Sequence, residues 1–185
     1  MSKVSELPLS GIRVVDHGHV WAGPLLGMSF RDMGAEVIKI QSPGTSSGVS
    51  MAGQGMPGTA ATQIDSHDQM NYHTLDRGKK SLTLNLKTIE GKEIYKRLIK
   101  LSDVVIENFS SRTMESLGLT YKVLNELNPR IIMASLSATG CSPGPWKELV
   151  SYGPSLSALY GIKSLLGYHD SDRPVEDQAD LDPTA

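Results

Sequence analysis

One continuous stretch, residues 11–40 (GIRVVDHGHVWAGPLLGMSFRDMGAEVIKI), sets the strongest limit on the fold of this chain. Runs rich in β-branched residues at 12–16 and 37–40 predict two short buried strands. Pro24 stands where the first turn of a helix tolerates a missing N–H, and Gly34 is a typical residue for ending a helix. We therefore predict a strand–helix–strand unit with parallel strands and a right-handed crossover.

The remaining sequence continues this alternation of strands and helices. We expect strands at 81–86, 103–106 and 130–136, the last of them buried, and helices at 88–101, 111–117, 120–127 and 154–166. Thr88 and Thr120 are predicted to cap two of these helices, and Gly91 to weaken the first of them. Residues 41–66 are rich in glycine and are predicted to form a long loop. The alternation predicts an α/β fold with a mostly parallel sheet.

The composition excludes several classes of protein. With 185 residues, of which 39% are hydrophobic, the chain is long enough for one domain with a buried core. No apolar run is long enough to cross a membrane, and a net charge of −2 gives no reason to expect nucleic-acid binding. The first residues contain no hydrophobic signal sequence, and the single Cys141 cannot form an internal disulfide, so we expect a cytoplasmic protein. Without a histidine near it in the sequence, Cys141 is better interpreted as a loop residue than as a catalytic thiol.

Motifs for three common kinds of site are incomplete. GTSSG at 44–48 matches the nucleophile elbow of serine hydrolases, but a glycine-rich loop follows it where that motif needs a helix, which favours a flexible loop. The glycines after the first strand lack the dinucleotide-binding spacing, and no G-K-[ST] motif occurs. His17 and His19 lack further ligands nearby, so we expect no metal site; we predict that one imidazole lines a pocket and the other packs. Residues 169–172 (HDSD) are predicted to form a solvated loop.

Two polar features leave a structural and a functional interpretation open. Arg77, Lys79 and Lys80 crowd one turn, which is either a solvated hairpin or a cationic patch for a phosphorylated ligand. Asn108 follows the strand at 103–106, at the end of the sheet where α/β proteins place ligand contacts. An asparagine at this position also serves to stabilise a turn.

Many segments in a fixed order resemble the family III CoA-transferases, the CaiB–BaiF family. These segments are LSGIRVVDHGHVWAGP, MGAEVIKI, DRGKKSLTLNLKTIEG, SDVVIENFSSRTMESLGLTYKVLNELNPRIIMASLSATG, SPGPW and YGPSLSALYGI. The resemblance implies a Rossmann-like sheet with flanking helices, an acyl-CoA substrate, no permanently bound cofactor and a homodimer of two interlocked ring-shaped chains. Residues 1–185 would then form the N-terminal part of the family's large domain, with the second half of the family's chain absent.

The resemblance also implies a nucleophile, Asp182. The family uses an aspartate in the pattern D-x-x-[AS]-G, and residues 182–185 read Asp-Pro-Thr-Ala. That aspartate attacks an acyl-CoA thioester to give a mixed anhydride, the freed CoA thiolate forms an aspartyl-CoA thioester, and a carboxylic acid acceptor completes the exchange. Asp180 is an offset candidate, which is disfavoured because Leu181 and Asp182 follow it.

Further site residues follow from matching positions. The resemblance assigns contacts in the CoA site to His19, Trp21, Ala22, Lys79 and Asn108, with Arg112 as a substitute for an arginine that the family commonly has at Ser116. Gln41 and Ser42 stand where the family usually has an acidic residue and then an arginine. The loss of two cations would weaken phosphate binding, because charge-assisted hydrogen bonds are the strong ones.

Two other functions remain to be weighed against the transferase. The family includes α-methylacyl-CoA racemases, which use a histidine–aspartate pair where this chain has Tyr152 and Gly153, so racemisation is disfavoured. The family's chains are also longer than this one. We therefore expect either a transferase half that is inactive by itself or a non-catalytic CoA-binding or dimerising module.

Overall fold

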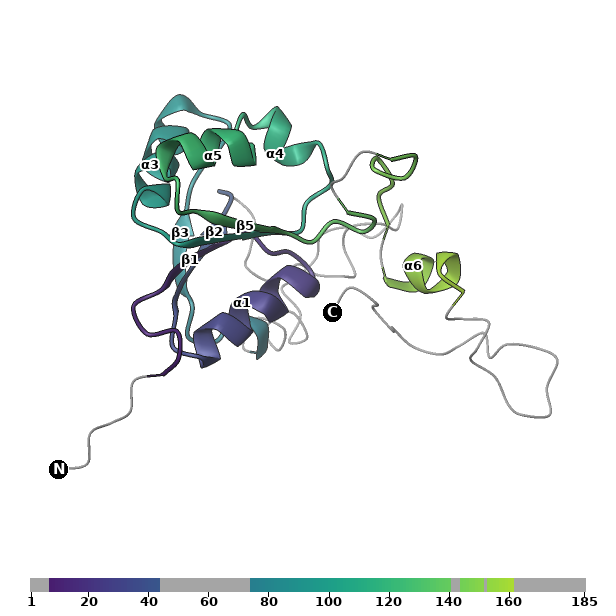
Figure 1. Ribbon diagram of the computed structural model, residues 1–185, viewed down its shortest axis with the longest axis horizontal. Coiled ribbons are helices and arrows are strands. Elements are labelled where there is room, and N and C mark those ends of the chain that lie inside the picture. Colours follow the sequence, from purple (N-terminus) through teal and green to yellow (C-terminus); the bar gives the residue numbers. More distant parts are fainter. Residues whose placement is uncertain (1–6, 44–73, 141–143, 152, 162–185) are drawn as a thin grey trace.

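A computed structural model describes residues 7–43, 74–140, 144–151 and 153–161 of the chain. Its centre is a five-stranded sheet in the order β3-β2-β1-β4-β5, in which all neighbouring strands are parallel (Figure 1). The strands are β1 (Arg13–Asp16), β2 (Glu36–Gln41), β3 (Lys80–Thr83), β4 (Val104–Glu107) and β5 (Ile132–Ser135). The predicted α/β class and parallel sheet are confirmed. The strand order reverses between β1 and β4, which are hydrogen-bonded neighbours.

Helices cover both faces of the sheet. They are α1 (Ala22–Asp32), α3 (Ile89–Ile99), α4 (Thr113–Ser116), α5 (Tyr121–Leu127) and α6 (Gly153–Leu159). Figure 1 shows α1 on one face and α3, α4 and α5 on the other, with α6 set apart from the sheet. None of the helices in the described residues is both long and apolar enough to cross a membrane.

The two sheet faces form two separate apolar cores. Successive side chains of a strand point to opposite faces, so Val14 and Val15 of β1 enter different cores. The core beneath α3 and α5 includes Val15, Ile40, Tyr95, Ile99, Val105 and Leu124. The core beneath α1 includes Val14, Ala35, Val37, Val104 and Ile106, with Leu26 and Phe30 packed against it. Burial on both faces explains why the central strands are apolar runs rather than alternating patterns.

Both predicted residues occupy helix N-cap positions, but only one of the two makes the side-chain hydrogen bond of a cap. Thr88 caps α3, and its Oγ1 accepts a hydrogen bond from the N–H of Gly91 at 3.1 Å. Thr120 occupies the N-cap position of α5 without a side-chain hydrogen bond. Gly91, expected to be a weak point in the first turn of α3, lies in a tight contact, because a Cβ there would lie 2.0 Å from the carbonyl oxygen of Asn85. Glycine is what allows this close contact.

The outer strands differ most from the sequence-based expectation. β3 ends at Thr83, three residues before the end of the predicted strand. The prediction that the strand at 130–136 is buried is wrong: within the described residues β5 pairs with β4 alone, and Ile132 is 62% exposed. β5 is an edge strand, so its burial is less complete than that of β1 and β4.

Several features singled out in the sequence lie outside the described residues. They are the GTSSG motif and most of the 41–66 loop, Cys141, Tyr152, residues 169–172, Asp180 and Asp182, together with the end of the predicted 154–166 helix.

Candidate functional site

The turn between β1 and α1 meets the loop after β4 where the strand order reverses. Parallel α/β sheets bind ligands at this point, outside the carboxyl ends of the strands. Asn108 links the two loops: its Oδ1 accepts a hydrogen bond from the N–H of His19 at 2.7 Å, and its Nδ2 donates to the carbonyl oxygen of His19 at 2.7 Å. The turn-stabilising interpretation of Asn108 is therefore confirmed, and its contact with CoA stays a prediction.

Side chains also hold the backbone N–H and carbonyl groups of Gly18, just before His19. The N–H of Gly18 donates to Oδ1 of Asp16 at 2.6 Å, and its carbonyl oxygen accepts a hydrogen bond from Nζ of Lys39. Val20 follows with a φ of 61°, a left-handed conformation that costs a β-branched residue on the order of 1–3 kcal/mol. Side chains from β1, from β2 and from the end of β4 thus fix a strained turn before any ligand binds.

Three glycines owe their identity to close packing in this turn. A Cβ at Gly18 would lie 2.4 Å from the carbonyl carbon of Gly23, and a Cβ at Gly23 would lie 2.4 Å from Cα of Gly18. A Cβ at Gly27 would lie 2.4 Å from Oδ2 of Asp16. These glycines let α1 pack against the end of β1, which explains why their spacing does not follow a nucleotide-binding motif.

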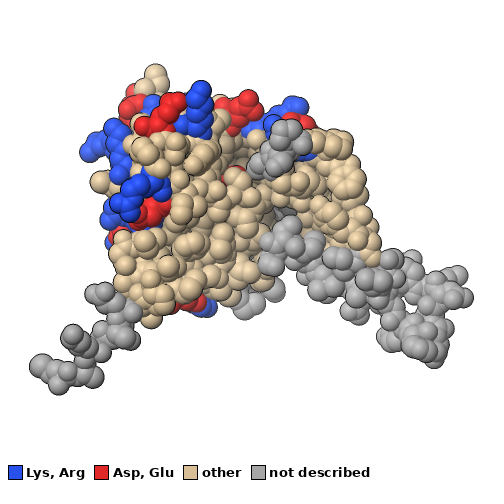
Figure 2. Space-filling view, viewed as in Figure 1, with Lys and Arg blue, Asp and Glu red and all other residues tan. Residues whose placement is uncertain are grey.

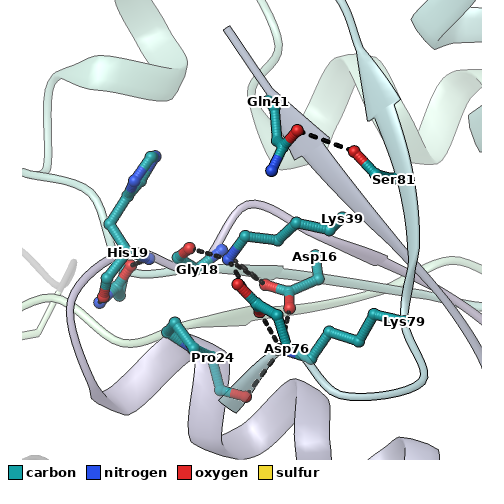
Figure 3. A network of polar contacts seen from close by, with 10 residues as sticks. Asp16, Gly18, His19, Pro24, Lys39, Gln41, Asp76, Lys79 and Ser81 are labelled. Carbon is teal, nitrogen blue, oxygen red and sulfur yellow. Dashed lines mark hydrogen bonds and ion pairs between the residues drawn. The ribbon is translucent and has the colours of Figure 1, made fainter. Parts of the chain in front are cut away.

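Four charged side chains form a buried network beneath the turn (Figure 3). Nζ of Lys79 donates to Oδ2 of Asp16 at 2.8 Å, to Oδ1 of Asp76 at 2.8 Å and to the carbonyl oxygen of Pro24 at 2.9 Å. Nζ of Lys39 lies 3.8 Å from Oδ1 of Asp16 and 3.7 Å from Oδ1 of Asp76. The four side chains are at most 8% exposed. Two carboxylates balance two ammonium groups, so the network buries no net charge.

Sequence reasoning missed three members of this network, Asp16, Lys39 and Asp76. A signal was present, because Lys39 interrupts the apolar run of β2 (EVIKIQ) and Asp16 ends the buried run of β1. A charge inside a strand that is covered on both faces needs an opposite charge nearby. That signal predicts a buried ion pair, but it does not identify the partner.

Of the two interpretations left open for Arg77, Lys79 and Lys80, the cationic patch is disfavoured, because all three cations have acidic partners within the chain. Arg77 pairs with Asp32, and Lys80 pairs with Glu36. An ammonium group has three N–H donors, and all three of Lys79 are engaged within the chain. On the face shown in Figure 2, Lys and Arg side chains lie beside Asp and Glu side chains. Contact of Lys79 with CoA stays a prediction, one that this geometry disfavours.

His17 is the histidine of the pair that packs. Its side chain is buried, with Nε2 2.9 Å from the hydroxyl oxygen of Tyr95, and the ring centroid of Phe109 lies 5.7 Å away. Burial, and then the charges of His19 and Lys39, lower the pKa of His17 to about 3. Burial, and then Glu107, raise the pKa of Tyr95. His17 is therefore a neutral residue that joins the turn to α3.

His19 lies closer to the surface of the same turn. It is half-buried, and its ring centroid lies 5.3 Å from that of Phe109. Burial is the largest cause that lowers the pKa of His19, followed by the charge of Lys39, whereas Asp16 and Asp76 raise it. A neutral imidazole at this place can donate or accept a hydrogen bond with a ligand bound at the turn.

Stability should fall steeply with acid because of His17. The unfolded chain takes up a proton near pH 6.5 and the folded chain only near pH 3, so stability is complete above pH 6.5 and is lost as the pH falls toward 3. We expect His17 to add a slope of up to about 1.4 kcal/mol per pH unit in this window. Urea unfolding of the parent and of His17→Gln at several pH values measures it. Equal slopes for the two proteins would contradict this assignment.

The other predicted site residues lie at the start of α1 and just before α4. Trp21 occupies the N-cap position of α1 and is 39% exposed, whereas Ala22, the first residue of α1, is buried. Arg112 precedes α4, is largely exposed and pairs with Glu148. Asp182 lies outside the described residues, so its position relative to the turn stays a prediction. Within the described part of the chain, no group of three or more His, Cys, Asp or Glu residues could hold a metal ion.

Comparison with known proteins finds relatives that are named as CoA-transferases. The succinate–glutarate CoA-transferase of Agrobacterium fabrum is 37% identical over 163 residues, which cover 88% of this chain and 40% of that protein. The succinyl-CoA:glutarate CoA-transferase of Homo sapiens is 33% identical over 176 residues, which cover 94% of this chain and 38% of that protein. The chain thus spans about two fifths of the length of these relatives.

A solved structure and a family profile agree with this result. The crystal structure of a CAIB/BAIF family protein from Brucella suis matches with a TM-score of 0.77 and 32% identity, over 94% of this chain and 44% of that one. The profile described as CoA-transferase family III matches residues 9–180. With this match over most of its length, the chain belongs to CoA-transferase family III.

Proposed function

We propose that this chain carries the acyl-CoA-binding turn and the nucleophile of an acyl-CoA:carboxylate CoA-transferase. The observation that supports this most is the turn at 17–21, hydrogen-bonded to Asn108 at the reversal point of the sheet in a chain of this family. A preorganised turn is what a transferase needs to hold a thioester still during attack. His19, Trp21 and Ala22 would contact the ligand there.

The proposed reaction uses the carboxylate of Asp182. It attacks the thioester carbonyl carbon, which forms an acyl-aspartyl anhydride and breaks the bond to the CoA sulfur. The CoA thiolate then attacks the aspartyl carbonyl carbon, which gives an aspartyl-CoA thioester and releases the donor carboxylate. The acceptor carboxylate attacks this thioester and regenerates an anhydride and the thiolate. Attack of the thiolate on the acceptor's acyl carbon gives the new acyl-CoA and free Asp182.

The names of relatives suggest the first substrates to test. Succinyl-CoA and glutarate are named for the human relative, and formyl-CoA and oxalate for relatives from Rhodopseudomonas palustris. We infer that the active form is a cytoplasmic homodimer without a bound cofactor. Because the chain spans about two fifths of the human and Agrobacterium relatives, we expect little multiple-turnover exchange from the 185 residues alone.

A trapping experiment tests the nucleophile. The purified chain is incubated with succinyl-CoA and hydroxylamine, and peptides are analysed by mass spectrometry. We expect a small fraction of aspartyl hydroxamate at Asp182, present in the parent and in the matched control Asp180→Asn but absent in Asp182→Asn. Glutarate-dependent exchange is followed in parallel.

Each result distinguishes one part of the proposal. Hydroxamate at Asp180 would show that the nucleophile is misassigned. Rapid exchange by the purified chain would contradict the expected low activity. CoA binding measured by calorimetry, without any hydroxamate, would favour the non-catalytic CoA-binding module.

A further inference from the structure

We propose that Lys39 is a positioning residue of the acyl-CoA site: its ammonium group holds the carbonyl oxygen of Gly18 and so fixes the turn that carries His19 and Trp21. This inference deepens the proposed function and rests on it for the identity of the ligand. It assigns a role to a buried lysine that the proposed chemistry does not use.

The position of Lys39 makes this role specific. Its side chain extends from β2 to the carbonyl oxygen of Gly18, between the two aspartates of the network (Figure 3). Lys79 holds the two aspartates and Pro24 but makes no bond to the turn residues 17–21. Among the four charged side chains, Lys39 is thus the cation that bonds to the turn. A charge-assisted hydrogen bond at a buried carbonyl is strong enough to hold a turn that contains a strained residue.

Lys39 also places a positive charge near the imidazole of His19. The charged groups that act on His19 come from three parts of the sheet: Lys39 from β2, Asp16 from β1 and Asp76 from the segment before β3. Lys39 lowers the pKa of His19 more strongly than Asp16 or Asp76 raises it. The neutral His17 and the amide of Asn108 complete the polar surroundings of the turn. Lys39 therefore supports both the shape of the turn and the neutral form of His19.

The test uses a charge-balanced pair of substitutions. Lys39→Met alone would leave two buried carboxylates with one cation, whereas Lys39→Met combined with Asp76→Asn leaves the Asp16–Lys79 pair neutral. Lys80→Met is the matched control, because Lys80 is a largely exposed lysine on β3 that pairs with Glu36. Thermal unfolding followed by circular dichroism confirms that each variant is folded before further measurement.

Two ligand-free measurements decide the proposal. In an NMR pH titration, with His19 assigned through His19→Gln, we expect His19 of the double variant to titrate at a higher pH than in the parent. We expect its backbone amide to exchange with solvent faster by on the order of tenfold, since the turn has lost a hydrogen bond to a charged group. Lys80→Met should match the parent in both. If the folded double variant shows the same His19 titration and the same amide exchange as the parent, the proposal is overturned. Faster amide exchange with an unchanged His19 titration would also overturn it, because that result indicates lost packing only.

Binding of CoA separates this proposal from the proposed function. A parent chain that binds CoA, with a dissociation constant on the order of tenfold higher in the double variant, supports both. A parent chain that does not bind CoA contradicts the proposed function, and Lys39 would then have no acyl-CoA site to position. In that case the two ligand-free measurements still decide whether Lys39 fixes the turn. CoA affinity that is equal in the parent and the double variant would overturn the positioning role.

Discussion

Replacement of Asp16 by asparagine is expected to lower the free energy of unfolding by about 3–5 kcal/mol, the usual cost of removing one partner from a buried ion pair. Asp16 is fully buried and accepts hydrogen bonds from Lys79 at 2.8 Å and from the N–H of Gly18 at 2.6 Å. The asparagine has nearly the same size, so the expected loss comes from charge. Lys39 and Lys79 would then share the single carboxylate of Asp76. Urea unfolding at neutral pH measures the difference.

A matched control and a rescue make this prediction specific. Glu36→Gln removes an acid from a partly exposed group of ion pairs with Arg13 and Lys80, where we expect a loss of at most about 1 kcal/mol. Adding Lys39→Met to Asp16→Asn restores neutrality and should recover part of the lost stability. An Asp16→Asn protein as stable as Glu36→Gln would show that the network is not held together by its charges.

Replacement of Gly18 by alanine is expected to destabilise the protein by about 3 kcal/mol or more, at the upper end of the range for overpacking. The added Cβ would lie 2.4 Å from the carbonyl carbon of Gly23 and 2.5 Å from the nitrogen of Pro24, both backbone atoms. Neither atom can move unless α1 shifts away from β1. The midpoint of urea unfolding, with the slope unchanged, measures the effect.

Gly140→Ala is the comparison for this substitution. Gly140 has a φ of +84°, but a Cβ there meets no atom of the described residues within 4 Å, so among them only the backbone conformation opposes alanine. We expect a cost of about 1–2 kcal/mol for that conformation. Equal losses for Gly18→Ala and Gly140→Ala would mean that the contact between residues 18 and 23 relaxes without cost.

The strands that could be predicted are those whose burial leaves a run of apolar residues in the local sequence. The apolar runs at 12–16, 37–40 and 103–106 correspond to β1, β2 and β4, because strands covered on both faces must be apolar throughout. The edge strands were less well predicted. Ile132 in β5 is exposed, yet its sequence has the same apolar character as a central strand. Position in the sheet decides its burial, and that position is set by pairing with β4.

The site was predicted only in part for a related reason. Asn108 and the turn with His19 were recognisable because each follows a strand directly. The ion network was missed because Asp16 and Lys79 are 63 residues apart, and nothing in either local sequence identifies the other as its partner. The role of Gly18 also depends on a remote contact, since its neighbour is the backbone of Gly23 after a reversal of the chain.

The network in Figure 3 also has a consequence for the first crossover as the chain is synthesised. Asp16 and Lys39 lie on adjacent strands, but the atoms of their ion pair are 3.8 Å apart, whereas Lys79 reaches Asp16 at 2.8 Å. Until residues 76–79 are made, burial of β1 leaves Asp16 without its closest cation. We therefore expect the crossover at 11–40, although it is the most clearly specified local unit, to become stable only once the segment that leads into β3 is made.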